Sequence, residues 1–161
     1  MLLVSACLAG EPVRYDGKSC TVSLIKSLIA QGKAKPICPE CLGGLPTPRP
    51  AAEIQGGTGD DVLAGRAKVI DSNGQDVSAA FIAGAYQTLK IVQFYQAIAI
   101  VLKENSPSCG SQFIYNGQFN GQKRTGLGVT AALLKQHGFE ILSEHELEQW
   151  YANQKLSLGS C

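Results

Sequence analysis

Three short apolar runs in this chain each lead into a loop that carries a cysteine and glycine. The loops are SACLAG with Cys7, ICPECLGG with Cys38 and ENSPSCGS with Cys109. If the runs are neighbouring parallel strands, their carboxyl ends lie along one edge of a sheet, where open α/β folds bind ligands. The three thiols would then converge on one centre, and three thiolates leave a metal centre with one open position.

Strand-like apolar runs alternate with helical patterns along the chain. We expect strands at residues 1–6, 34–37, 67–71, 97–102 and 140–142, and helices at residues 21–31, 76–94 and 130–137. Ser143 and Glu146 form a capping box before a last helix. Asn116 and Gly117 lie between residues 113–115 and Phe119, which indicates a small hairpin.

This alternation favours a three-layer α/β fold with a mainly parallel, Rossmann-like sheet. We predict a single domain over residues 1–150 and a C-terminal tail at residues 151–161, with Cys161 at its end. Residues 38–65 are rich in Pro, Gly and Thr and have no apolar period. Because loops of this length are uncommon in a compact domain and usually functional, we predict a long active-site loop there.

The composition narrows the possible partners and location. The 161 residues, 45% apolar and 17% charged, fit one soluble domain. A net charge of +1 disfavours duplex nucleic acid as a partner. The chain has no signal-peptide pattern and no apolar stretch of about 18 residues, so we predict a cytoplasmic protein without a membrane segment. The oligomeric state stays open.

In a reducing compartment, the six cysteines are metal ligands, catalytic groups or buried thiols rather than a disulfide framework. Cys20 begins a helical pattern and is expected to lie outside a shared site. Cys38 and Cys41 have the two-residue gap of many metal and redox sites.

Polar residues near these cysteines are the other candidates. Glu40 follows Cys38 by two residues, so it can ligate a metal, transfer protons or remain a solvated loop residue. Ser106 and Ser108 flank Pro107, where they can bind a substrate or form a turn. Four charged residues lie in the same Gly- and Pro-rich loops and either order those loops by pairing or contact substrate: Arg14, Asp16, Arg49 and Glu53. We select Arg14 and Ser108 as candidate substrate-binding residues.

Several longer motifs together resemble the thiouracil desulfidase family. They are VSACLAGEPVRYDG, ICPECLGGLPTPRPAAEI, DVLAGRAKVID, LKENSPSCGS and GVTAALLKQHGFEILSE. The resemblance covers nearly the whole chain, to about Leu147. It implies a 4Fe-4S cluster held by three cysteines, with the fourth iron free to bind sulfur of a thiolated nucleobase. The matching cysteines are Cys7, Cys38 and Cys109.

The resemblance also implies that Glu40 is the acid/base group and that a serine of SPSCG assists, with Ser106 preferred over Ser108. The implied reaction is hydrolytic desulfuration of a small thiolated pyrimidine such as 2-thiouracil, with sulfide and the oxo base as products. A soft thiocarbonyl sulfur matches the iron-sulfur environment. Cys41 departs from the family pattern, which usually has a non-ligand residue at its position.

Two alternatives use Cys41. In the first, Cys7, Cys38, Cys41 and Cys109 close a tetrahedral zinc site in a non-catalytic metal-binding or sulfur-carrier protein. In the second, Cys38 and Cys41 form a thiol redox pair, although the sequence around them lacks the pattern of a thioredoxin-like unit.

Overall fold

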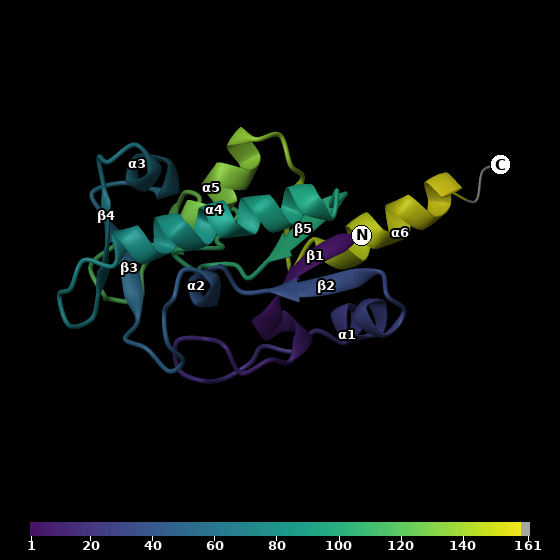
Figure 1. Ribbon diagram of the computed structural model, residues 1–161, viewed down its shortest axis with the longest axis horizontal. Helices are drawn as coiled ribbons and strands as arrows, with labels where there is room; N and C mark the ends of the chain where they lie inside the picture. Colours follow the sequence, from purple (N-terminus) through teal and green to yellow (C-terminus); the bar gives the residue numbers. More distant parts are fainter. Residues whose placement is uncertain (159–161) are drawn as a thin grey trace.

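The computed structural model describes residues 1–158 and has the predicted α/β fold (Figure 1). Its central sheet has four parallel strands in the order β2-β1-β5-β8. These strands are β2 (Ala34–Ile37), β1 (Leu2–Ser5), β5 (Ala99–Leu102) and β8 (Ile141–Ser143). The first strand is shorter than expected, because Ala6–Ala9 turns into a 3-10 helix, η1, directly after it.

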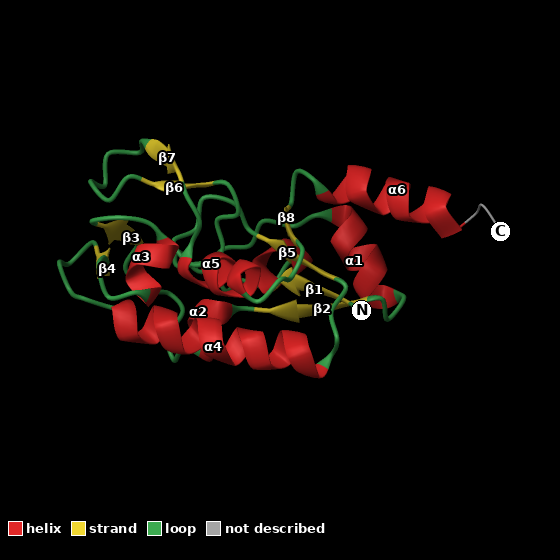
Figure 2. Cartoon of the chain, turned by 90° about the horizontal axis from the view of Figure 1, so that it is seen from above, coloured by secondary structure: helices red, strands yellow, loops and turns green. Residues whose placement is uncertain are grey.

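Helices cover both faces of this sheet. Helices α4 (Ser78–Phe94) and α5 (Val129–Gln136) lie on one face, and α1 (Ser23–Ala30) and α6 (Leu147–Leu158) lie on the other (Figure 2). Leu3 packs with the core of the first face, whereas Leu2 and Val4 pack with the core of the second. Strand β1 is therefore apolar at successive positions, as expected for a strand that is buried on both faces.

The segment predicted as one continuous loop, residues 38–65, contains three short elements instead. They are α2 (Pro39–Leu42), β3 (Ala52–Gln55) and α3 (Gly59–Leu63). Strand β3 pairs antiparallel with β4 (Lys68–Asp71) in a separate two-stranded sheet. These elements form without an apolar period in their sequence because contacts with other parts of the fold hold them in place.

Helix α2 is held against α4 by a close approach of two glycines. A Cβ on Gly43 would lie 2.1 Å from the carbonyl oxygen of Ala80, and a Cβ on Gly84 would lie 2.0 Å from that of Pro39. Only glycine leaves room for backbones at this distance. This contact fixes α2, and with it Cys38 and Glu40, relative to the rigid helix α4.

The predicted hairpin has a different second strand. Strand β6 (Phe113–Tyr115) pairs with β7 (Lys123–Thr125), and residues 116–122 form a longer connection. Phe119 lies in that connection with a left-handed backbone, φ 52°. The Glu53 carboxylate accepts hydrogen bonds from the amides of Gly117 and Phe119, at 2.9 and 3.3 Å. A contact distant in sequence therefore shapes this loop.

The C-terminal segment predicted as a tail begins within α6, and the chain is helical as far as Leu158. Cys161 lies outside the described residues. Among the helices of residues 1–158, none is long and apolar enough to cross a membrane.

Candidate active site

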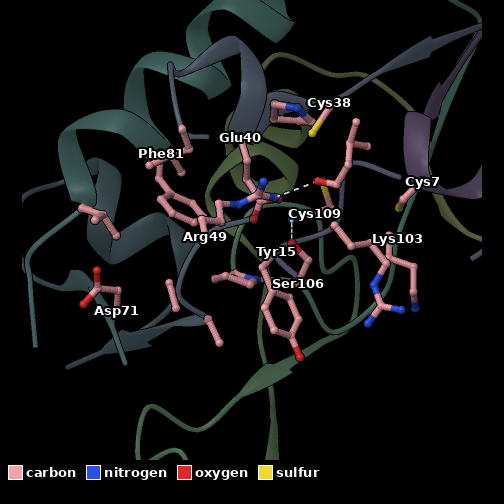
Figure 3. A pocket seen from close by; sticks show the side chains of 18 of the residues that line it. Cys7, Tyr15, Cys38, Glu40, Arg49, Asp71, Phe81, Lys103, Ser106 and Cys109 are labelled. Atoms are coloured by element: carbon pink, nitrogen blue, oxygen red, sulfur yellow. Dashed lines mark hydrogen bonds and ion pairs between the residues drawn. The ribbon is translucent and has the colours of Figure 1, made fainter. Parts of the chain in front are cut away.

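The three predicted cysteines converge on one cavity of about 520 Å³ (Figure 3). Cys38 follows β2, Cys7 follows β1 and Cys109 lies in the loop after β5, and these strands are adjacent in the sheet. Cys7 is 8% exposed and Cys109 is 5% exposed. The carboxyl edge of the parallel sheet therefore gathers the three thiols, as the order of apolar runs predicts.

Burial keeps these thiols uncharged unless a cation is present. It raises the pKa of Cys7 to about 11 and the pKa of Cys38 to about 12. It also raises the pKa of Cys109 well above its ordinary value, and the charges of Glu40, Cys38 and Cys7 add to this effect. Thiolates at these positions need a positively charged centre, so the donor set fits a thiolate-ligated metal group.

The thiols line a shared cavity, and they do not form a compact site for one ion. Within residues 1–158, no three His, Cys, Asp or Glu side chains are grouped closely enough to hold a single metal ion. Cys41 is an exposed residue of α2, and its Sγ lies 3.8 Å from Thr47 Oγ1. The described residues that line the cavity include Cys38 and exclude Cys41.

Glu40 is a half-buried acid in the same cavity, with 17% of its side chain exposed. Its carboxylate forms an ion pair with Arg49, whose side chain is only 5% exposed. Burial raises the pKa of Glu40 above its usual value, although the Arg49 charge and hydrogen bond lower it. A carboxyl group with a raised pKa can exchange protons nearer to neutral pH than an ordinary glutamate can.

Arg49 also orders the loop around Glu40. Its guanidinium donates hydrogen bonds to the carbonyl of Val13 at 3.1 Å, the carbonyl of Pro46 at 3.2 Å and Thr47 Oγ1 at 3.1 Å. These contacts agree with the interpretation of Arg49 as a residue that orders its loop by pairing with a charge. Its paired acid is Glu40, which the sequence spacing alone does not indicate.

The two serines of the SPSCG motif occupy different environments. Ser106 lines the cavity, and its Oγ accepts hydrogen bonds from the amides of Ser108 at 3.1 Å and Cys109 at 3.2 Å. Ser108 is 1% exposed, and its hydroxyl is 2.8 Å from that of Thr130. The structure thus places Ser106 at the cavity and Ser108 behind its wall, where Ser108 fixes the loop to α5.

Two cations lie at the cavity edge. Arg14 lines the cavity and is 3.9 Å from Asp16, so this pair is another of the predicted loop charges that meet. Lys103 follows β5 directly, lines the cavity and lowers the pKa of Cys7, against the larger effect of burial. Its ammonium forms an ion pair with Glu144 beside β8. Sequence analysis missed Lys103, although its position between the most apolar run and SPSCG was a usable signal.

The far end of the cavity is formed by residues of β3, β4 and α4, of which the sequence analysis named only Glu53. Glu53 of β3 and Asp71 of β4 are buried carboxylates in its lining, and Phe81 of α4 lies close by (Figure 3). Asp71 Oδ1 accepts amide hydrogen bonds from Asn73 and Gln75, both at 2.9 Å. The antiparallel β3–β4 pair supplies this wall, and its pairing is not visible in the apolar pattern.

Glu104 orders the loop that carries Cys109 by bonding to residues on both sides of this cysteine. Its carboxylate accepts five hydrogen bonds, from the amides of Asn105, Ser111, Gln112 and Phe113 and from the hydroxyl of Ser111. Burial alone would raise the pKa of Glu104, but these hydrogen bonds outweigh it and lower the pKa below the ordinary value. The carboxylate form therefore stabilises the loop that carries Cys109.

We expect Glu104→Gln to lower the free energy of unfolding by about 1.5–3 kcal/mol at neutral pH, a typical contribution of hydrogen bonds to a charged group. Because the folded pKa is depressed, the carboxylate's contribution is complete above the ordinary pKa of 4.5 and is lost as pH falls through the folded value. Urea unfolding of both proteins across acidic pH measures this. Glu148→Gln, on α6, is the matched control. A difference that stays constant down to pH 2 would contradict the assignment.

The fold and the cavity together define an α/β protein that gathers three thiols and a half-buried acid at the carboxyl edge of its sheet. The chain belongs to the 2-thiouracil desulfurase family, whose model matches residues 2–146.

Two relatives extend this assignment. An uncharacterized protein of Bacillus subtilis (strain 168), YbbK, is 54% identical over 147 residues, which cover 91% of this chain and 97% of the relative. A solved structure described as the [4Fe-4S]-dependent thiouracil desulfidase TudS is 43% identical, with a TM-score of 0.84. That match covers 96% of this chain and 97% of the TudS chain.

Proposed function

We propose that this protein is a 4Fe-4S-dependent desulfidase that converts a small thiolated pyrimidine, such as 2-thiouracil, into the oxo base and sulfide. The observation that carries the proposal is the convergence of Cys7, Cys38 and Cys109 on a cavity that also contains the half-buried acid Glu40. Membership of the 2-thiouracil desulfurase family and the likeness to TudS support it. The predicted cytoplasmic location is part of the proposal, since thiol ligands stay reduced there.

In this proposal, Cys7, Cys38 and Cys109 hold the cluster through their thiolates. Three protein ligands leave one of four irons without a cysteine. When bound, the cluster supplies a Lewis-acidic iron with affinity for soft sulfur. The raised pKa values of the free thiols mean that loading the site releases protons, so incorporation is favoured at higher pH.

The chain's own residues then handle the substrate and its protons. Water adds its oxygen to the ring carbon, the carbon–sulfur bond breaks, and sulfur leaves as sulfide. Glu40 accepts the proton of the attacking water, and Arg49 keeps its carboxylate in place. The Oγ of Ser106 already accepts hydrogen bonds from two backbone amides. Its hydroxyl hydrogen therefore donates to the substrate or to the water. Arg14 contacts the substrate at the cavity edge, and Ser108 supports the loop.

We expect protein reconstituted with iron and sulfide under anaerobic conditions to contain about four irons per chain. It should release sulfide from 2-thiouracil in a 1:1 ratio with uracil, since hydrolysis requires no net electron transfer. Metal analysis, sulfide detection and chromatography of the base measure this. Protein that retains zinc, excludes iron and releases no sulfide would instead support the four-cysteine zinc site.

A further inference from the structure

Cys41 is a second thiol beside Cys38 that the proposed reaction does not use. Cys38 is the N-cap residue of the short helix α2, and Cys41 lies three residues later within that helix. Leu42 N–H donates to the carbonyl of Cys38 at 3.0 Å, so the segment from Cys38 to Leu42 forms one helical turn. Residues three apart in such a turn face the same side, and their Cα separation falls in the range that a disulfide accepts.

The two thiols differ in access to solvent. Cys41 is exposed and Cys38 is partly buried, whereas Cys7 and Cys109 are buried. An oxidant from solvent therefore reaches Cys41 before it reaches the proposed cluster ligands.

We propose that Cys38 and Cys41 form a reversible disulfide when the site lacks its cluster and a hydroperoxide is present. This modification site rests on the proposed function for the ligand role of Cys38. Cys41 attacks the peroxide, so a sulfur–oxygen bond forms, the oxygen–oxygen bond breaks and one water leaves. Cys38 then attacks the Cys41 sulfur, forms the disulfide and displaces the second water. Each sulfur loses one electron, and hydrogen peroxide takes both.

The disulfide holds Cys38 in a form that a thiol reductant restores. Without Cys41, a first hydrogen peroxide oxidises Cys38 itself to the sulfenic acid and releases water, and a second takes this to the sulfinic acid, which thiols do not reduce. Cys41 thus preserves the ability of the empty site to accept a new cluster, and it withholds Cys38 from iron until reducing conditions return. The exposed thiol is a protective partner of a ligand.

The test uses the full-length chain, freed of iron, fully reduced and treated with hydrogen peroxide. Tryptic cleavage is convenient because the peptide from Ala34 to Arg66 contains Cys38 and Cys41 and no other cysteine. We expect this peptide to become about 2 Da lighter, to resist alkylation and to recover with dithiothreitol. A disulfide that maps instead to Cys7 and Cys20, whose backbones are hydrogen-bonded at 2.8 Å, would overturn the proposal.

The Cys41→Ser variant separates protection from chance proximity. After peroxide and then dithiothreitol, the wild type and the matched Cys20→Ser control should regain cluster absorbance on reconstitution, while Cys41→Ser loses most of it and carries a sulfinic acid at Cys38. Equal recovery in Cys41→Ser would overturn the proposal. Disulfide mapping needs no cluster: a wild type that forms the disulfide but never binds iron would refute the proposed function and leave the disulfide established.

Discussion

We expect the replacement of Cys109 by alanine to abolish cluster binding and to reduce sulfide release from 2-thiouracil to the background rate. The thiol is buried between the neighbouring loops and is one of three that share the cavity. Two thiolates hold fewer than the three corners that the proposed cluster requires. Iron content, the visible absorbance of the reconstituted protein and sulfide release measure the effect, and Cys7→Ala and Cys38→Ala should behave in the same way.

Cys41→Ser is the matched control for these variants, because Cys41 is adjacent to Cys38 but does not line the cavity. It should keep its iron and its activity under anaerobic conditions. Circular dichroism separates loss of ligand from loss of fold. If Cys41→Ser lost the metal as completely as Cys109→Ala, the site would have four thiolate ligands, as in the zinc alternative.

Glu40→Gln should lower kcat by about a hundredfold to ten-thousandfold, the usual contribution of a positioned acid/base group. Glutamine keeps the size of the side chain and an oxygen that accepts from Arg49, but it cannot take a proton from water. Cluster absorbance should be unchanged, because Glu40 is not one of the proposed ligands. Steady-state kinetics on reconstituted protein, normalised to bound iron, measure the effect.

The pH profile tests the same role independently. Burial raises the pKa of Glu40, so the base form is lost as pH falls through a value above the ordinary 4.5. The acidic limb of kcat/KM should therefore lie above that value in the wild type and be missing in Glu40→Gln. Arg49→Met, which removes the charge that lowers this pKa, should move the limb to higher pH, while Arg49→Lys moves it less. An unchanged limb in Glu40→Gln would assign it to another group.

Sequence reasoning located the proposed chemistry because the ligand candidates belong to local motifs that follow simple strands. A continuous apolar run such as AIAIVL is typical of a parallel strand whose sheet is covered by helices on both faces. Cys109 follows this strand, so its place at the carboxyl edge of the sheet could be predicted. Convergence at one sheet edge then follows from topology. The position of Glu40 two residues after Cys38 placed it near the thiols, and the family resemblance implied its acid/base role.

Residues whose position depends on distant contacts were not predictable in the same way. Strand β3 carries Glu53 into the cavity wall only because it pairs with β4, and its own four residues have no strong strand pattern. The difference between Ser106 and Ser108 depends on Thr130, a residue of α5 that is 22 positions away in sequence. Such partners are set by packing, which local patterns do not encode.

The β3–β4 pair gives the cavity two walls of separate origin. The thiols and Glu40 belong to the edge of the main sheet and to α2. Glu53 and Asp71 belong to the separate two-stranded sheet formed by β3 and β4. Substitutions in β3 or β4 can therefore change the shape and charge of this cavity wall without moving a sulfur atom. The β3–β4 wall and the thiol-bearing edge can thus vary independently of each other.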